Sequence, residues 1–390
     1  MNTIEMDRQY VAGTYNRFPL EITEGSGSIV KDAAGKEYID LGSGIAVTSF
    51  GIGDPVWKAA VTEQIGKVQH MSNLYYTEPC AKLAKLLCEK TGMKKVFFSN
   101  SGAEANECAI KVARKYAADT KGEEYSTIIT LKNSFHGRTI TTLAATGQEH
   151  YHEMFKPLTP GFVHAQAGNA SELYELAAQH KIAAVMIECI QGEGGVVPLS
   201  KEYARDVAAF VKEQDCLLVV DEVQTGNGRT GSLYAYMQLG LTPDIVSTAK
   251  GLAGGLPLGA TLLSEKVQHT LGFGDHGSTF GGNPVCAAAA LSILERINDD
   301  LLAEVRKKSE YIFRTFEKAE GVEGVSGMGL MIGIKTKAPA GDIVKKCMDR
   351  GVLVLTAKDK VRLLPALNIP MEDLQRAIEI IKDVCAGKEE

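Results

Sequence analysis

Two short apolar runs, each ending on charged side chains, constrain the fold of this chain most strongly. Residues 216–220 lead into Asp221 and Glu222, and residues 245–249 lead into Lys250 and a glycine-rich turn. Short apolar runs bounded by polar residues and glycine predict buried strands of a parallel sheet. Because ligands bind at the carboxyl ends of such strands, Asp221 and Lys250 are expected to face one pocket.

Lys250 is expected to be chemically reactive at such a strand end. Burial removes solvation from an ammonium group and lowers its pKa, and the neutral amine can then attack a carbonyl to form a Schiff base. The glycines that follow it leave room for a flat ligand to approach the backbone. An ordinary surface lysine is the alternative, and this stretch alone weighs the two equally.

Composition narrows the choice of partner. The chain has 390 residues, enough for two domains, and a net charge of −6 without a basic block, which argues against nucleic acid or an anionic membrane. Residues 1–20 lack the apolar core of a signal peptide, and no later run is long enough to span a bilayer. The eight cysteines form no C-x-x-C pair and no zinc spacing, so we expect no metal and a cytoplasmic enzyme.

A strand predicted at residues 95–98 runs directly into a helix that opens with small and polar residues. The free N–H groups of a helix start, together with the hydroxyl of Ser101, can bind a phosphate, and Gly102 lets the phosphate approach closely. An N-cap with glutamate at the third helical position explains the same residues. Taken alone, the junction favours the simple cap.

The strand predicted at residues 126–131 is followed by a second polar segment. Phe135 can stack on a flat ring, and the guanidinium of Arg138 can bind a carboxylate with two parallel hydrogen bonds. His136 lies between them and is interpreted as a neighbour of the site rather than a catalyst.

Two glycine-rich loops are candidates for a functional site, and the sequence supports the first more strongly than the second. Residues 183–187 predict a strand that leads into Glu188 and Glu193 among glycines, which indicates either a mobile polar lip or a plain loop with solvated acids. Residues 226–231 match the letters G-x-G-x-x-G of a dinucleotide site. That motif requires a strand directly before it and a helix starting within it, and neither is predicted here, so a dehydrogenase is disfavoured.

The chain ends predict a second, smaller unit. Residues 1–45 contain a hairpin in otherwise irregular chain, and a helical pattern runs continuously from residue 287 to 319. The last ninety residues alternate short strands with helices, as in an α+β domain. The N-terminal hairpin can pack on this unit and make the domain discontinuous.

Taken together, six stretches resemble the class III aminotransferases, the ornithine, acetylornithine and GABA type. In chain order they are Ser-Gly-Ala-Glu-Ala-Asn at 101–106, Phe-His-Gly-Arg-Thr at 135–139, Gln-Gly-Glu-Gly-Gly at 191–195, Asp-Glu-Val-Gln-Thr-Gly at 221–226, Lys-Gly at 250–251 and Gly-Ser-Thr-Phe-Gly-Gly-Asn-Pro at 277–284. The resemblance covers essentially the whole chain, and the full set in this order is far more specific than any one stretch.

The resemblance implies an α/β protein with the type I fold of aminotransferases that use pyridoxal 5'-phosphate. A large domain at 46–300 would hold a mainly parallel central sheet flanked by helices, and 1–45 with 301–390 would form a small α+β domain. It also implies a homodimer with shared active sites. A non-catalytic binding protein on the same scaffold is the alternative of another class, disfavoured because Lys250, Asp221 and Arg138 are all present.

By position, the resemblance implies roles for the cofactor residues. Lys250 would be the Schiff-base lysine and proton shuttle, Asp221 the partner of the pyridine nitrogen, and Gln224 a donor to the phenolic oxygen. Thr279 would reach the phosphate of the neighbouring subunit. The remaining cofactor contacts would be Ser101, Gly102 and Ala103 at the phosphate, Phe135 and Val223 on the two ring faces, and Glu188 and Ser278.

The resemblance also implies two arginines for the substrates. Arg138 would take a carboxylate distant from the reacting amine, and Arg362 the α-carboxylate of 2-oxoglutarate. Glu193 would act as a catalytic gate that pairs with Arg362 while an ω-amine donor is bound and swings away for glutamate. A permanent Glu193–Arg362 ion pair without gating is the alternative.

Gly44 bears on the identity of the amino donor. Ornithine aminotransferases carry a bulky tyrosine in the matching segment, whereas glycine leaves space for an N-acyl group, and Tyr15 is expected to line the same channel. N-acetylornithine, a precursor of arginine, is therefore the expected donor. Ornithine, GABA, succinylornithine and N-succinyl-diaminopimelate are the alternatives, because those enzymes share every cofactor residue.

Overall fold

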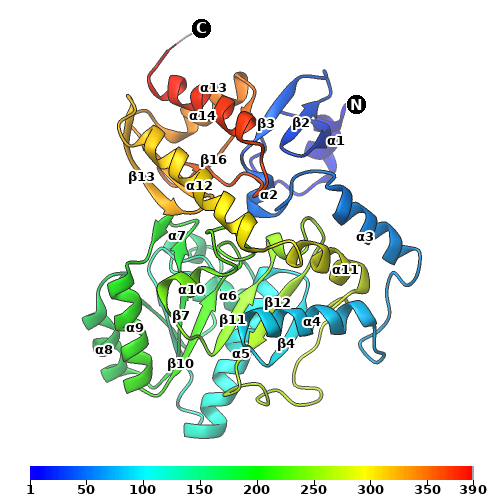
Figure 1. The fold of residues 1–390 in the computed structure, drawn as a ribbon. Helices are drawn as coiled ribbons and strands as arrows, with labels where there is room; N and C mark the ends of the chain where they lie inside the picture. Colours follow the sequence, from blue (N-terminus) through cyan, green and yellow to red (C-terminus); the bar gives the residue numbers. More distant parts are fainter. Residues whose placement is uncertain (389–390) are drawn as a thin grey trace.

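The larger part of the structure is built on a seven-stranded sheet (Figure 1). The computed structural model describes residues 1–388. In spatial order the sheet contains β4 (Lys95–Ser99), β12 (Gly259–Leu263), β11 (Ile245–Thr248), β10 (Leu217–Asp221), β7 (Ile182–Glu188), β5 (Thr127–Leu131) and β6 (Phe162–Ala165). Neighbours from β11 to β6 pair in parallel, whereas β12 pairs antiparallel with both β11 and β4. The sheet is mainly parallel, as predicted.

Helices cover both faces of this sheet because its strands are apolar on both sides. In β10, Leu218 and Val220 join one hydrophobic core, while Leu217 and Val219 join another. The second core is completed by α5 (Gly102–Lys121). The first core is completed by α4 (Glu78–Thr91), α8 (Ala170–Gln179), α9 (Lys201–Glu213), α10 (Ala235–Leu239) and α11 (Pro284–Leu294). Strands buried on both faces give continuous apolar runs, the pattern that predicted them.

The smaller part of the structure combines both ends of the chain (Figure 1). β3 (Glu37–Asp40) pairs in parallel with β15 (Val352–Leu353). One sheet has the order β1 (Ile22–Ser26), β2 (Ile29–Asp32), β3, β15, and the other has the order β13 (Val322–Met328), β14 (Met331–Thr336), β17 (Lys360–Leu363), β16 (Leu355–Ala357). Both pack on a core with α12 (Asp299–Phe316), α13 (Ala340–Asp349) and α14 (Met371–Cys385). This pairing supports our proposed domain division.

One predicted helix is wrong. The sequence predicts a continuous helical stretch over 287–319, but α11 ends at Leu294 and a new helix, α12, begins at Asp299. Asn298 caps α12 by accepting a hydrogen bond from the backbone N–H of Leu301. The apolar spacing continues across the break and therefore hides it.

The N-terminal segment also differs from the expectation of a hairpin in irregular chain. α1 (Thr3–Tyr10) forms there because Asn2 and Glu5 make a capping box. The remaining elements are α2 (Ser43–Ala46), α3 (Pro55–Ile65), α6 (Ile140–Ala145), α7 (Glu149–His152), the 3₁₀ turn η1 (Lys250–Leu252), β8 (Ile190–Gln191) and β9 (Val197–Pro198). Across residues 1–388, no helix is both long and apolar enough to cross a bilayer.

Candidate active site

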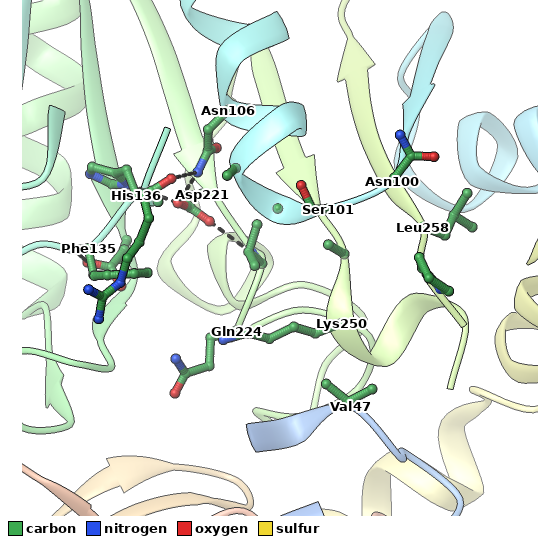
Figure 2. Close-up of a pocket in the computed structure, with 18 of the residues that line it drawn as sticks. Val47, Asn100, Ser101, Asn106, Phe135, His136, Asp221, Gln224, Lys250 and Leu258 are labelled. Atoms are coloured by element: carbon green, nitrogen blue, oxygen red, sulfur yellow. Dashed lines mark hydrogen bonds and ion pairs between the residues drawn. The ribbon is translucent and has the colours of Figure 1, made fainter. Parts of the chain in front are cut away.

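A cavity of about 430 Å³ opens at the carboxyl ends of the central strands. Figure 2 shows Asp221 and Gln224 of one segment and Lys250 of another gathered in it. The cavity is lined by Val47, Asn100, Ser101, Gly102, Ala103, Asn106, Phe135, His136, Gly137, Arg138, Glu188, Asp221, Val223, Gln224, Ala249, Lys250, Gly255, Leu256, Pro257 and Leu258. The strand-end rule thus brings most of the sequence-predicted site residues into one pocket.

Lys250 extends its side chain into this cavity (Figure 2). It begins the η1 turn, two residues after the end of β11, with a φ of 47° that few non-glycine residues adopt. Burial lowers the pKa of Lys250, and the Glu193 carboxylate offsets this shift only in part. A lowered pKa increases the share of neutral amine, the form that can attack a carbonyl.

Asp221 is held in place by a buried hydrogen-bond network. Its Oδ2 accepts from Asn106 Nδ2 at 2.7 Å and from His136 Nδ1 at 2.8 Å, and its Oδ1 accepts from the backbone N–H of Val223 at 2.9 Å. Asn106 also donates to the backbone carbonyl of His136 at 2.8 Å, which ties the two donors together. Three donors on one carboxylate fix its orientation toward the cavity.

The start of α5 lines one end of the cavity. Ser101 is its N-cap and accepts from the backbone N–H of Glu104 at 3.2 Å, so the capping interpretation of this junction is confirmed. The cavity also reaches Ser101, Gly102 and Ala103. A Cβ on Gly102 would lie 2.5 Å from Val223 Cγ1, so only glycine fits beneath Val223.

Glu193 and Arg362 form an ion pair that contacts Gln224, a residue of the cavity lining. Arg362 Nη1 donates to Glu193 Oε1 at 2.5 Å and to Gln224 Oε1 at 3.2 Å, and Gln224 Nε2 donates to Glu193 Oε1 at 3.3 Å. Burial alone would raise the pKa of Glu193, but the charge and hydrogen bond of Arg362, together with Lys250 and Gln224, outweigh burial and leave this pKa below its usual range. The Arg362 guanidinium, on β17 and only 3% exposed, thus joins the smaller unit to the pocket.

Glu188 lies at the end of β7 with its carboxyl group fully enclosed. Burial, and secondarily the Asp221 charge, raises the pKa of Glu188 well above its usual range. Its Oε2 accepts from the backbone N–H of Phe135 at 2.9 Å. Glu188 therefore fixes the segment that carries the Phe135 ring.

Arg138 reaches the cavity from the same segment and remains exposed. Its guanidinium carbon lies 4.5 Å from the ring centroid of Tyr151 and 5.8 Å from that of Phe135. Contact with two aromatic rings restricts the guanidinium and leaves its edge able to bind a carboxylate.

Six predicted residues do not line this cavity in the single chain. Glu193 and Arg362 contact its lining residue Gln224. Tyr15 is 74% exposed and lines a separate hollow made by the N-terminal segment. Gly44 lines another hollow, beside α13. Ser278 Oγ accepts from Nδ2 of Asn100, a lining residue of the cavity, at 3.1 Å, whereas Thr279 is exposed. Their roles stay predictions.

Sequence reasoning missed Asn106 and Tyr151, and it gave His136 too small a place. Asn106 had one signal, a polar side chain on the buried, alanine-rich face of a predicted helix. His136 had the same signal as Phe135 and Arg138, namely a position in the polar segment that directly follows the β5 strand. Tyr151 lies in the four-residue helix α7, whose sequence has no pattern that could have identified it.

Comparison with known proteins identifies the family. The family model for class III aminotransferases matches residues 10–385. Acetylornithine aminotransferase from Haemophilus ducreyi is 50% identical over 382 residues, 97% of each chain, and the Methanocaldococcus jannaschii protein of the same name is 42% identical over 98% of each chain.

Solved structures give the same family. Ornithine aminotransferase from Toxoplasma gondii superposes with a TM-score of 0.94 at 30% identity, over 98% of this chain and 94% of the other. N-acetylornithine aminotransferase from Stenotrophomonas maltophilia gives 0.85 at 34% identity, over 98% of both chains. The expected type I aminotransferase fold is confirmed, and the chain belongs to the class III aminotransferases.

Proposed function

We propose that this aminotransferase uses pyridoxal 5'-phosphate to move the amino group of N-acetylornithine to 2-oxoglutarate, giving N-acetylglutamate 5-semialdehyde and glutamate in a ping-pong reaction of arginine biosynthesis. The observation that best supports this proposal is the similarity to relatives named acetylornithine aminotransferase, which are 42% and 50% identical over nearly full length. Fold similarity does not discriminate between donors, because an ornithine enzyme superposes with a higher TM-score than an N-acetylornithine enzyme.

The space beside Gly44 supports an acylated donor, although in the single chain Gly44 lines the hollow beside α13 and is connected to the catalytic cavity through Val47. A Cβ placed on Gly44 would find only the Val47 Cβ within 4 Å, at 3.6 Å, and Val47 itself lines the catalytic cavity. A tyrosine there would fill this space, whereas glycine leaves it for an acetyl group. Ornithine, GABA, succinylornithine and N-succinyl-diaminopimelate are the competing donors.

The residues present fit pyridoxal 5'-phosphate. The start of α5, where Ser101, Gly102 and Ala103 line the cavity, suits a phosphate. Asp221 presents an oriented carboxylate, which suits a protonated ring nitrogen. Phe135 and Val223, both lining the same cavity, suit the two faces of a flat ring. Lys250 supplies an amine of lowered pKa for the aldehyde carbon.

Bound in this cavity, pyridoxal phosphate supplies an acceptor for the electron pair left when a proton leaves the amine-bearing carbon. Lys250 Nζ takes that proton and returns it on the other side of the transferred nitrogen. Asp221, whose carboxylate is held by Asn106 and His136, would keep the proton on the ring nitrogen. Gln224 would hydrogen-bond the ring's phenolic oxygen, and Arg138 would hold the donor's carboxylate.

Glu193 and Arg362 would let one site take two kinds of substrate. While Glu193 pairs with Arg362, the guanidinium is neutralised and does not attract the wrong end of an ω-amine donor. When Glu193 moves away, Arg362 can bind the α-carboxylate of 2-oxoglutarate with two parallel hydrogen bonds. Masking an attraction in one half-reaction gives specificity without a second site.

A homodimer with shared active sites is part of this proposal. Large apolar side chains are exposed on one connected surface, Leu74, Tyr75, Tyr76 and Phe280. Asn73 joins its two segments by donating to the carbonyls of Ser278 and Gly281. Exposed apolar patches of this kind mark protein interfaces. Thr279 lies within this surface and would reach the partner's phosphate.

The cellular location in this proposal is the cytoplasm. The eight cysteines are all free, which agrees with a reducing compartment.

A donor panel tests the proposal. The cofactor-loaded protein is mixed with one amine at a time and no acceptor, and the loss of long-wavelength absorbance is followed. We expect N-acetylornithine to react fastest, with ornithine and GABA slower. If ornithine, GABA or a succinylated donor reacts fastest, the donor assignment is wrong while the aminotransferase assignment stands.

A further inference from the structure

The glycine-rich segment at 226–231 has a role that its dinucleotide-like letters do not reveal. No helix begins within it, since α10 starts only at Ala235, and it therefore lacks the geometry of a dinucleotide site. Its side chains instead contact two functional chain segments, one in each part of the molecule. We call residues 226–231 the clamp turn.

Asn227 holds the clamp turn against the lysine segment. Its Nδ2 donates to Thr248 Oγ1 at 3.0 Å and to the carbonyl of Ala249 at 3.1 Å. Ala249 directly precedes Lys250, so this bond fixes the backbone that carries the reactive amine. Asn227 has a φ of 58°, a conformation that asparagine tolerates better than most residues.

Arg229 holds the other side of the clamp turn against the arginine segment. Its Nη1 donates to the carbonyl of Pro365 at 2.5 Å and to that of Leu330 at 3.1 Å, and its own carbonyl accepts from Leu330 N–H at 2.9 Å. Pro365 lies three residues after Arg362. Because proline has no N–H, its carbonyl is the only backbone group through which hydrogen bonding can fix it.

Burial of the Arg229 guanidinium lowers the stability of the fold, so a contact with only a structural role would not favour arginine at this position. It is 2% exposed, and burial lowers the pKa of its guanidinium to about 9, so the group stays charged at neutral pH. In the part of the chain that the structure describes, its hydrogen bonds go to backbone carbonyls and no carboxylate pairs with it. A buried charge without an acid costs free energy, which argues for a geometric requirement at this position.

We propose that Arg229 is a positioning residue that sets the distance between Arg362 and Lys250. Through the Pro365 carbonyl it fixes the end of β17, while Asn227 of the same turn fixes the end of β11. This inference rests on the proposed function, because the acceptor role of Arg362 belongs to it.

The two half-reactions separate positioning from folding. Arg362 binds the acceptor directly, but in the donor half-reaction it stays paired with Glu193. Loss of the Arg229 bonds should therefore weaken acceptor binding and spare the donor. Misplacement of a binding group by about 1 Å can cost roughly 100-fold in rate, so a shift of a few tenths of that size predicts about a tenfold effect.

The experiment compares Arg229→Met, Arg229→Lys and Lys308→Met in the cofactor-loaded protein. Lys308 is a matched control, since it is also buried and cationic and donates to a carbonyl of the same segment, that of Leu367, at 2.9 Å. Leu367 keeps a second anchor, its N–H to the carbonyl of Ser49 at 2.8 Å. Steady-state KM values for 2-oxoglutarate and for the donor are measured, together with calorimetric binding of glutarate.

We expect Arg229→Met to raise the KM for 2-oxoglutarate and the Kd for glutarate about tenfold, with the donor KM changed less than twofold. Arg229→Lys, which can reach one carbonyl, should lie between, and Lys308→Met should lower the melting temperature without this split. Equal changes for both substrates, or the same split in Lys308→Met, would overturn the positioning role. If Arg229→Met fails to fold, Arg229→Lys decides. A wild type without transamination refutes the proposed function instead.

Discussion

Replacing Glu193 by alanine tests the proposed gate by which one pocket would serve two half-reactions. In the wild type Arg362 is occupied by Glu193 and Gln224, and an incoming α-carboxylate must displace the Glu193 carboxylate. Without that carboxylate the guanidinium is free at all times. Glutamate and other α-amino donors should then react faster relative to the ω-amine donor.

The size of the effect follows from the contact that is lost. A hydrogen bond to a charged group contributes about 1.5–3 kcal/mol. The Glu193 side chain is 26% exposed, so water screens part of the pair and the lower end, about 1.5–2 kcal/mol, is appropriate. Since 1.4 kcal/mol corresponds to a factor of ten, the reactivity ratio should shift about 10- to 30-fold toward glutamate.

The assay is a pair of single half-reactions followed by absorbance, one with glutamate and one with N-acetylornithine. Glu193→Gln is the matched control, because an amide of the same size still accepts from Arg362 but carries no charge. It should give an intermediate ratio. An unchanged ratio in Glu193→Ala would refute gating and leave a permanent ion pair as the role of these two residues.

Three further perturbations test other parts of the account. Gly102→Ala places a Cβ 2.5 Å from Val223 Cγ1, which should cost about 1–3 kcal/mol in unfolding free energy and weaken cofactor binding; adding Val223→Ala should restore stability, and an equally destabilised double variant would contradict the clash. Burial raises the pKa of Glu222 from 4.5 to about 7, so between these values the folded chain keeps a proton that the unfolded chain has lost. The unfolding free energy of the wild type relative to Glu222→Gln should therefore fall by roughly 1.4 kcal/mol per pH unit from about pH 5 to 7 and level off above. Urea unfolding of both proteins across this range measures the difference, and parallel pH curves for the two proteins would contradict the raised pKa. Thr279→Ala should lose cofactor faster on dialysis because Thr279 would bind the partner's phosphate, and normal retention would count against the shared site.

Much of the pocket could be predicted because its chemistry follows strand ends. β10 ends at Asp221 and β11 ends two residues before Lys250, so apolar runs followed by polar residues were sufficient to bring both to one edge of the sheet. Phe135 and Glu188 obey the same rule. The local sequence pattern is sufficient to identify such residues, because the topology of a parallel sheet brings the carboxyl ends of its strands to one edge.

Contacts between distant segments could not be predicted in the same way. Asn106 meets Asp221 across 115 positions, and Arg229 meets Pro365 across 136. Around Arg229 the letters match a dinucleotide motif that the missing strand and helix exclude, but they do not reveal the contact with Pro365, since glycines that permit close backbone packing look the same as glycines that admit a dinucleotide. The helix break before Asp299 was hidden for a related reason, because apolar spacing does not record a change of direction.

The most direct test of the account is chemical trapping at Lys250. The holoenzyme is reduced with borohydride, digested, and its peptides are analysed by mass spectrometry, with Lys250→Ala as the control. The account predicts the mass of one reduced cofactor on Lys250 of the wild type and none on the corresponding peptide of the variant. Label on a different lysine, or none on the loaded wild type, would contradict the assignment of this pocket as the site of transamination.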